Sequence, residues 1–282
     1  GYTLEQHYFG EHPDIELQRN IDAAFPGERV LLTSVSRDGS RAVAAVTGPQ
    51  RVGDYYLLDT QRMQMVYLGG LNAGLVPEQM AAVTPFAIRS PDGLVLGGYV
   101  TKPERAETPL PMVVIPHSGP IGVKDSHLFN REAQFFAHHG YAVLQLNFRG
   151  STGYGKDFVN AGDKEWGAKM HTDLLDAVDW VVGQGYAERS KVAIYGGSYG
   201  GYAALAGAAF TPDVFACAVD IVGPSNLKTL IESIPPYWAP MIAQFHTRVG
   251  NPETDADLLW ERSPLSRVDD IAIPLLIAQG AN

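Results

Sequence analysis

The segment 192–210 constrains the fold of this chain more than any other. An apolar run ends at Tyr195, glycines flank Ser198 on both sides, and small residues follow. This order is typical of a strand, a sharp turn and a helix. Only glycine fits beside the central residue of so tight a turn, and Gly196-x-Ser198-x-Gly200 has the spacing of a nucleophile elbow. The segment therefore predicts a serine exposed at the carboxyl edge of a sheet.

Ser198 is the candidate nucleophile. The N–H of Tyr199, at the helix N-terminus, points to where the oxyanion of a tetrahedral intermediate would form. Residues 117–120, His-Ser-Gly-Pro, follow an expected strand at 112–115. There Gly119 allows a second backbone N–H to approach a substrate oxygen. The alternative for both motifs is a glycine-rich turn without a catalytic role.

The first part of the chain is predicted to be an all-β segment. A short helix is expected at 15–24, and four β-type runs that alternate with turn signals then predict an antiparallel meander. The runs cover residues 30–35, 42–46, 55–58 and 65–68. Four such strands make one blade of a β-propeller, although a single blade cannot bury both of its faces. We expect one unit at residues 1–78 and a second at 79–282.

The second unit alternates strands and helices after a hairpin at 86–101. The expected strands cover residues 112–115, 142–146, 192–195, 216–222 and 274–278, and the expected helices 130–139, 173–182 and from 199 onward. Apolar runs without alternation belong to a parallel sheet that is covered on both faces. The predicted fold class is therefore α/β, an α/β-hydrolase fold with a mostly parallel sheet, preceded by a partial all-β segment.

Residues 223–270 interrupt this alternation with prolines and aromatic residues. An insertion before the last strand can cover the serine and line a pocket, or it can simply pack on the surface. Tyr237 and Trp238 are the candidate pocket residues, and they indicate an apolar pocket.

A base and an acid are missing from their usual places. Acyl transfer by serine needs a histidine and a carboxylate, which follow the serine in the order acid, then histidine. Only His246 comes after Ser198, and it lies in the insertion, ahead of the last expected strand. Packing in the insertion is the expected role of His246. The chain reaches Asn282 directly after a strand, so we expect it to stop before its acid and base.

Composition excludes several function classes. Lys and Arg total 21 against 31 Asp and Glu, and the formal net charge is −10 without a basic cluster. This balance argues against nucleic acid or an anionic membrane as a partner. No apolar run approaches the roughly 18 residues of a membrane-spanning helix. Small or peptide-like substrates remain, and a homo-oligomer is left open.

Cofactor and metal sites are not expected. The sequence contains neither His-Glu-x-x-His nor Cys-x-x-Cys. Residues 150–156 fit the spacing of a phosphate-binding loop up to its lysine. However, Asp157 stands where that loop needs Ser or Thr for magnesium, and its charge would repel phosphates. Arg149 is expected to make a structural ion pair instead.

Four separated motifs together resemble the prolyl oligopeptidase family, and within it the acylaminoacyl-peptidase and dipeptidyl-peptidase branch. They are residues 117–120, 147–155, 196–202, and 263–265 followed by 274–277. The resemblance covers residues 86–282, and the segment 30–68 more loosely resembles the last propeller blade of such proteins.

The resemblance implies a serine peptidase that acts on short peptides through an acyl-enzyme, without a cofactor. Ser198 matches the nucleophile, the N–H of Tyr199 and Gly119 match the oxyanion donors, and Tyr199 also matches a residue beside the pocket for the side chain before the cleaved bond. The family's usual motif is His-Gly-Gly-Pro, so Ser118 is a departure. The family's Asp lies in the loop that residues 280–282 enter, and its His lies further on.

Two other readings stay open. A carboxylesterase would share the elbow and the oxyanion loop and would differ in what its pocket accepts. A hydrolase-like scaffold that only binds partners would fit the missing base. We expect the parent protein to be active and residues 1–282 alone to be inactive.

Overall fold

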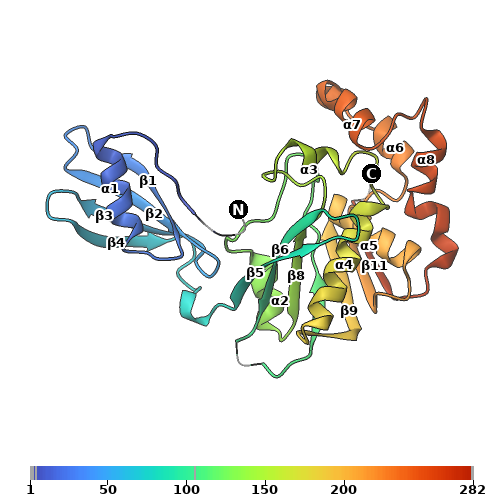
Figure 1. Cartoon of the computed structure of the whole chain (residues 1–282), viewed down its shortest axis with the longest axis horizontal. Helices are drawn as coiled ribbons and strands as arrows, with labels where there is room; N and C mark the ends of the chain where they lie inside the picture. Colours follow the sequence, from blue (N-terminus) through green and yellow to red (C-terminus); the bar gives the residue numbers. More distant parts are fainter. Residues whose placement is uncertain (1–2, 4, 105, 281–282) are drawn as a thin grey trace.

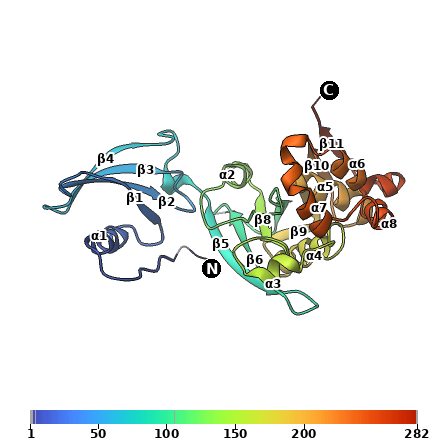
Figure 2. The same cartoon turned by 90° about the horizontal axis from the view of Figure 1, so that it is seen from above.

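The computed structural model describes residues 3, 5–104 and 106–280, which contain two β-sheets that lie side by side (Figures 1 and 2). The first sheet has four strands in the order β1-β2-β3-β4, and the second has seven in the order β11-β10-β9-β7-β8-β6-β5. A connection that contains the 3-10 turn η1 (Pro77–Gln79) joins them. The boundary at residue 78 remains a prediction.

The first sheet confirms the predicted antiparallel meander. Its elements are α1 (Pro13–Asp22), β1 (Arg29–Val35), β2 (Arg41–Thr47), β3 (Asp54–Asp59) and β4 (Gln64–Gly70). In β2, Ala42, Ala44 and Val46 are buried and alternate with half-exposed residues. They form a small core with Ile21 of α1, so the helix covers one face of this sheet.

The second sheet confirms the predicted α/β class. Its strands are β5 (Ala82–Arg89), β6 (Val95–Lys102), β7 (Leu110–Val114), β8 (Ala142–Asn147), β9 (Ala187–Gly197), β10 (Cys217–Ile221) and β11 (Leu275–Ala278). The hairpin β5-β6 joins β8 in antiparallel pairing, and the pairs β8-β7, β7-β9, β9-β10 and β10-β11 are parallel. The sheet is therefore mixed and mostly parallel.

Helices cover both faces of the second sheet. The helices of this unit are α2 (Arg131–His138), α3 (Lys156–Asn160), α4 (Lys169–Gly183), α5 (Tyr199–Phe210), α6 (Leu227–Glu232), α7 (Ile242–Arg248) and α8 (Ala256–Glu261). Successive residues of β7 point to opposite faces. Met112 and Val114 join the main core with α4 and α5, whereas Val113 packs with Ala133 of α2 on the other face.

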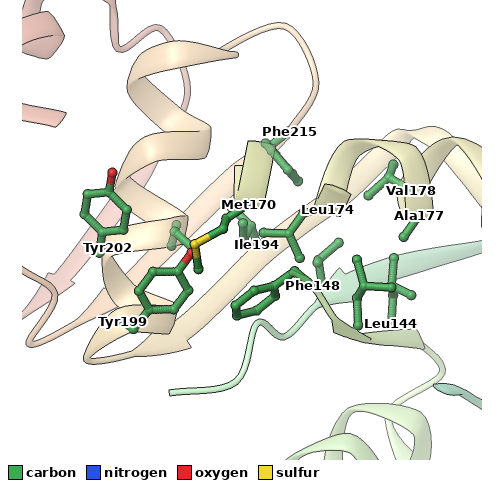
Figure 3. Packing of buried hydrophobic residues seen from close by; sticks show 14 of the residues in the cluster. Leu144, Phe148, Met170, Leu174, Ala177, Val178, Ile194, Tyr199, Tyr202 and Phe215 are labelled. Carbon is green, nitrogen blue, oxygen red and sulfur yellow. The ribbon is translucent and has the colours of Figure 1, made fainter. Parts of the chain in front are cut away.

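The main core lies between the sheet and helices α4 and α5. Figure 3 shows Met170 and Leu174 of α4 packed among Phe148, Ile194 and Tyr199. The face of α4 that packs in this core consists of the buried residues Leu174, Ala177, Val178 and Val181. This packing holds β9 and α5, and therefore the turn between them.

The local structure departs from the sequence prediction in two ways. Strand β9 begins at Ala187 rather than 192, because the polar residues 188–191 extend the strand where its side chains meet solvent. The sequence also did not predict α3 or the short helices of the insertion, α6 to α8, together with the 3-10 turns η2 (Pro236–Met241) and η3 (Pro264–Asp270). Helices this short depend on tertiary packing more than on local sequence.

Candidate active site

Ser198 lies in a strained turn between β9 and α5. Its backbone has φ 55° and ψ −117°, a conformation that residues with a side chain rarely adopt. Its N–H donates to the carbonyl of Ile221, at the end of β10, over 2.8 Å. A side chain at Gly196 would come within 2.5 Å of the backbone of Gly200. The turn therefore has the geometry that the Gly-x-Ser-x-Gly spacing predicts, with glycine required by close approach.

The loop after β7 lies against this turn. A side chain at Gly200 would come within 2.4 Å of the carbonyl oxygen of Pro116, so the two backbones are in contact. Gly119 has φ 112°, which favours glycine. The hydroxyl of Ser118 donates to the carbonyl of Gly197 over 3.0 Å. Two segments far apart in the sequence are thus joined directly beside Ser198.

Ser198 opens into a cavity of about 870 Å³ that Gly119 and Tyr199 also line. The structure therefore brings the candidate nucleophile and both candidate oxyanion residues to one space. Further lining residues are mostly apolar and come in part from the insertion; they include Ile121, Trp166, Val222, Trp238, Met241, Phe245 and Leu265. The insertion thus forms part of the cavity wall.

The two candidate pocket residues differ in position. Trp238 lines the cavity and is 45% exposed. Tyr237 lies outside the lining and is 79% exposed. Both lie on η2, and their rings make a T-shaped contact with centroids 6.3 Å apart and planes at 89° to each other.

The side chain of Tyr199 forms a wall between the cavity and the core. It is 2% exposed and packs edge-on against Trp166, with ring centroids 4.6 Å apart. It also packs in a tilted arrangement against Phe148, with ring centroids 5.3 Å apart (Figure 3). Burial raises the pKa of this phenol well above its usual value, so Tyr199 is neutral at ordinary pH. It contributes an apolar surface and a backbone N–H.

His246, the one histidine that follows Ser198 in the sequence, is not at the serine. His246 is half-buried on α7 and lies outside the cavity lining. In the part of the chain that the structure describes, the residues lining this cavity include no histidine. The loop expected to carry the acid begins at residue 280, and its residues Ala281 and Asn282 lie outside the described residues.

An ion-pair network with a buried centre, Arg149 and Asp173, lies at the end of β8, as expected for Arg149. The guanidinium of Arg149 donates to Asp173 on α4 over 2.7 and 2.8 Å and to Asp92 over 2.8 and 3.1 Å. Lys169 also pairs with Asp92, at 3.2 Å. Hydrogen bonds from Arg149 hold the pKa of Asp92 far below its usual range, whereas burial raises the pKa of Asp173 despite its bonds to Arg149. The network joins the β5-β6 turn, β8 and α4.

The sequence did not identify several features of the site. Trp166 lies in a polar loop before α4, where a single aromatic residue gives no periodic signal. The contacts of His117 were also missed. Its Nδ1 lies 2.8 Å from the carbonyl oxygen of Ser118, and its Nε2 lies 2.8 Å from the hydroxyl of Ser151.

The described residues show neither a metal-binding cluster nor a membrane-spanning helix. They contain no group of three or more His, Cys, Asp or Glu side chains placed to hold a metal ion. Within the same residues, no helix has the length and apolar character needed to cross a bilayer.

Comparisons with known proteins relate both sheets to longer proteins. Dipeptidyl aminopeptidase BIII of Pseudoxanthomonas mexicana is 45% identical over 272 residues, which is 93% of this chain and 39% of that protein. The structure of a puromycin-hydrolyzing peptidase from Mycobacterium tuberculosis aligns with a TM-score of 0.73 and 30% identity over 85% of this chain and 37% of the other. The acylaminoacyl peptidase of Pyrococcus horikoshii aligns with a TM-score of 0.72 over 88% of this chain and 39% of the other; at 24% identity this shows the fold alone.

This chain thus spans less than two fifths of the length of each of these proteins. The model of the prolyl oligopeptidase family matches residues 127–282, more than half of the chain, and the resemblance drawn from the four motifs is confirmed. The chain belongs to the prolyl oligopeptidase family of serine peptidases.

Proposed function

We propose that the parent protein hydrolyses peptide bonds of short peptides through an acyl-enzyme on Ser198. One observation carries the proposal: Ser198 occupies a strained turn and shares one cavity with Gly119 and Tyr199. Strain of this kind is kept in functional sites because it holds a reacting group in place.

The residues have distinct roles in the proposed reaction. The hydroxyl of Ser198 attacks the peptide carbonyl and loses its proton to a histidine base. The oxyanion that forms accepts hydrogen bonds from the N–H groups of Tyr199 and Gly119. The helix dipole of α5, whose N-terminus is at Tyr199, favours the same negative charge. Collapse of the intermediate breaks the C–N bond; the amine takes the proton from the histidine and leaves, and the acyl-enzyme remains. The same histidine then takes a proton from water, which attacks the ester, and returns it to Ser198 as the acid product leaves.

The base of this reaction is proposed to come from outside the described residues, because none of them brings a histidine to the cavity. We therefore propose that residues 1–282 alone have no peptidase activity. Peptidase activity in a preparation that mass spectrometry shows to contain only this chain would refute this part of the proposal.

The cavity supports a substrate with an apolar side chain near the cleaved bond. Trp166, Trp238 and Phe245 give it aromatic walls, and Tyr199 closes it toward the core. The name of the dipeptidyl aminopeptidase relative supports release of dipeptides from a peptide amino terminus. Trp238 is proposed to contact the substrate, and Tyr237 is proposed to do so only from the rim of the cavity.

The alternatives predict different results with an ester substrate and with a peptide anilide. A carboxylesterase would hydrolyse a simple ester and leave a peptide anilide intact. A scaffold that only binds partners would hydrolyse neither substrate. For residues 1–282 alone, this alternative is favoured by the absence of a histidine among the described residues that line the cavity.

A fluorophosphonate probe tests the proposal, because it phosphonylates only activated serines. In the full-length protein we expect one adduct, mapped to Ser198, and loss of both the adduct and peptide anilide hydrolysis in Ser198→Ala. The variant Ser190→Ala removes an exposed hydroxyl that donates to Glu188, two positions earlier, and serves as the control. Unchanged hydrolysis in Ser198→Ala would refute the assignment.

A further inference from the structure

We propose that Ser118 is a positioning residue, whose hydroxyl ties the loop that carries Gly119 to the turn that carries Ser198. The inference rests on the proposed function. Ser118 Oγ lies 3.0 Å from the carbonyl oxygen of Gly197, 79 positions later in the sequence. Since a carbonyl only accepts, the hydroxyl donates.

The bond acts on the peptide group that precedes the candidate nucleophile. Ser118 holds the carbonyl of the Gly197–Ser198 peptide, and Ile221 accepts from its N–H over 2.8 Å. A peptide group is planar, so bonds at both ends fix its tilt. This tilt sets the backbone from which the Ser198 hydroxyl and the Tyr199 N–H project.

The other side of Ser118 is held by the core. Its carbonyl accepts from Nδ1 of His117 over 2.8 Å. The His117 ring stacks on Phe148 with centroids 4.3 Å apart and planes 15° apart, and Phe148 in turn packs against Tyr199. Burial lowers the pKa of His117 to about 4, so the ring is neutral at pH 7 and keeps its single N–H for the Ser118 carbonyl.

Ser118 therefore connects the two candidate oxyanion donors. Gly119 follows it directly in sequence, and Tyr199 follows the peptide that it holds. The motif usual in the family has glycine here, which has no hydroxyl to make the bond. The side chain thus adds a contact to an oxyanion loop that already lies against the elbow through Pro116 and Gly200. We therefore expect that removal of the Ser118 hydroxyl weakens stabilisation of the transition state and changes substrate binding little.

The test compares Ser118→Ala with Ser118→Thr in the full-length protein, with Ser190→Ala as the control. Ser118→Ala is expected to lower kcat about five- to tenfold with KM unchanged, the effect of one neutral hydrogen bond. A peptide aldehyde that mimics the tetrahedral intermediate should bind more weakly by the same factor. Ser118→Thr keeps the hydroxyl and should stay within about twofold of wild type, as should Ser190→Ala.

Unchanged kcat in Ser118→Ala, or an equal loss in Ser118→Thr, would overturn the inference, and so would a rise in KM alone. Amide hydrogen exchange of the same proteins gives a readout that does not need turnover. Residues 117–123 and 196–200 should exchange faster in Ser118→Ala than in Ser118→Thr. If the wild type shows no hydrolysis and no probe adduct, the proposed function fails. Equal exchange rates in Ser118→Ala and Ser118→Thr would separately contradict the proposed role of the hydrogen bond from Ser118 to Gly197.

Discussion

The two sheets of this molecule bury their strands in different ways. In the seven-stranded sheet all six residues of β8 are buried, because helices cover both faces. In the four-stranded sheet α1 covers one face only, and Leu31, Val66 and Leu68 are 41, 61 and 55% exposed. Both sheets are rich in apolar residues, so apolar content alone does not indicate whether helices cover one face of a sheet or both. The number of covered faces decides how much each strand contributes to stability.

The covered sheet can also hold a buried charge network, and breaking it gives the largest expected effect. Asp173→Asn removes a fully buried carboxylate that accepts three hydrogen bonds from Arg149. We expect a loss of about 3–5 kcal/mol in the free energy of unfolding, because the guanidinium stays buried and loses the carboxylate that is buried with it, while Asp92 is partly exposed. Urea unfolding followed by tryptophan fluorescence measures it.

A matched control lies on the same helix. Asp179 of α4 is exposed and pairs with the exposed Arg189. Asp179→Asn should cost less than about 1 kcal/mol. Equal losses of unfolding free energy in Asp173→Asn and Asp179→Asn would mean that the buried ion pair stabilises the fold no more than the surface pair does.

Truncation of one leucine in each sheet compares the two cores directly. Leu144→Ala in β8 should cost about 2–5 kcal/mol, and Leu58→Ala in β3 should fall at the low end of that range, since its core is small. All four tryptophans lie at residues 166–260, in the seven-stranded unit. The unfolding midpoint followed by tryptophan fluorescence should therefore fall in Leu144→Ala and stay unchanged in Leu58→Ala.

Hydrogen exchange completes this comparison, because it reports β1 to β4 separately. Leu58→Ala should speed exchange in those strands alone. If it lowers the tryptophan-monitored midpoint as much as Leu144→Ala does, the two sheets unfold as one cooperative unit.

The contrast between the sheets also explains what the sequence could predict. The parallel strands were found from continuous apolar runs, and the turn at Ser198 from glycines that only close approach requires. Contacts between distant segments were not found. Arg149 meets Asp92 and Asp173 across 57 and 24 positions, and a sequence pattern carries no information on such pairing. The short helices of the insertion were missed because packing, rather than periodicity, forms them.

A buried carboxyl group in the seven-stranded unit should make the stability depend on pH. Asp125, in the loop after β7, accepts one hydrogen bond from Gln145 over 2.9 Å, and its other carboxylate oxygen is buried without a partner. Burial, with a further contribution from Glu132, raises the pKa of Asp125 to about 7. The folded state then binds more protons than the unfolded state between about pH 4 and 7, so stability falls as pH rises through this range.

Asp125→Asn should remove this loss. The variant is expected to match wild type near pH 4 and to exceed it by about 1–3 kcal/mol at pH 8, the range for an unsatisfied buried polar group. Tryptophan-monitored unfolding at both pH values measures the difference. A constant difference between the two pH values would show that Asp125 titrates normally.

The smallest effect is expected on the open face of the four-stranded sheet. Leu68→Lys places a charge where the side chain is already 55% exposed, so the free energy of unfolding should change by less than about 0.5 kcal/mol. Val46→Lys, in the same sheet but facing α1 and fully buried, should cost several times more, because the charge must leave water. Hydrogen exchange of β1 to β4 in both variants measures the ratio. Similar losses at the two positions would mean that both faces of this sheet are covered in solution, and the contrast between a sheet covered once and a sheet covered twice would no longer hold.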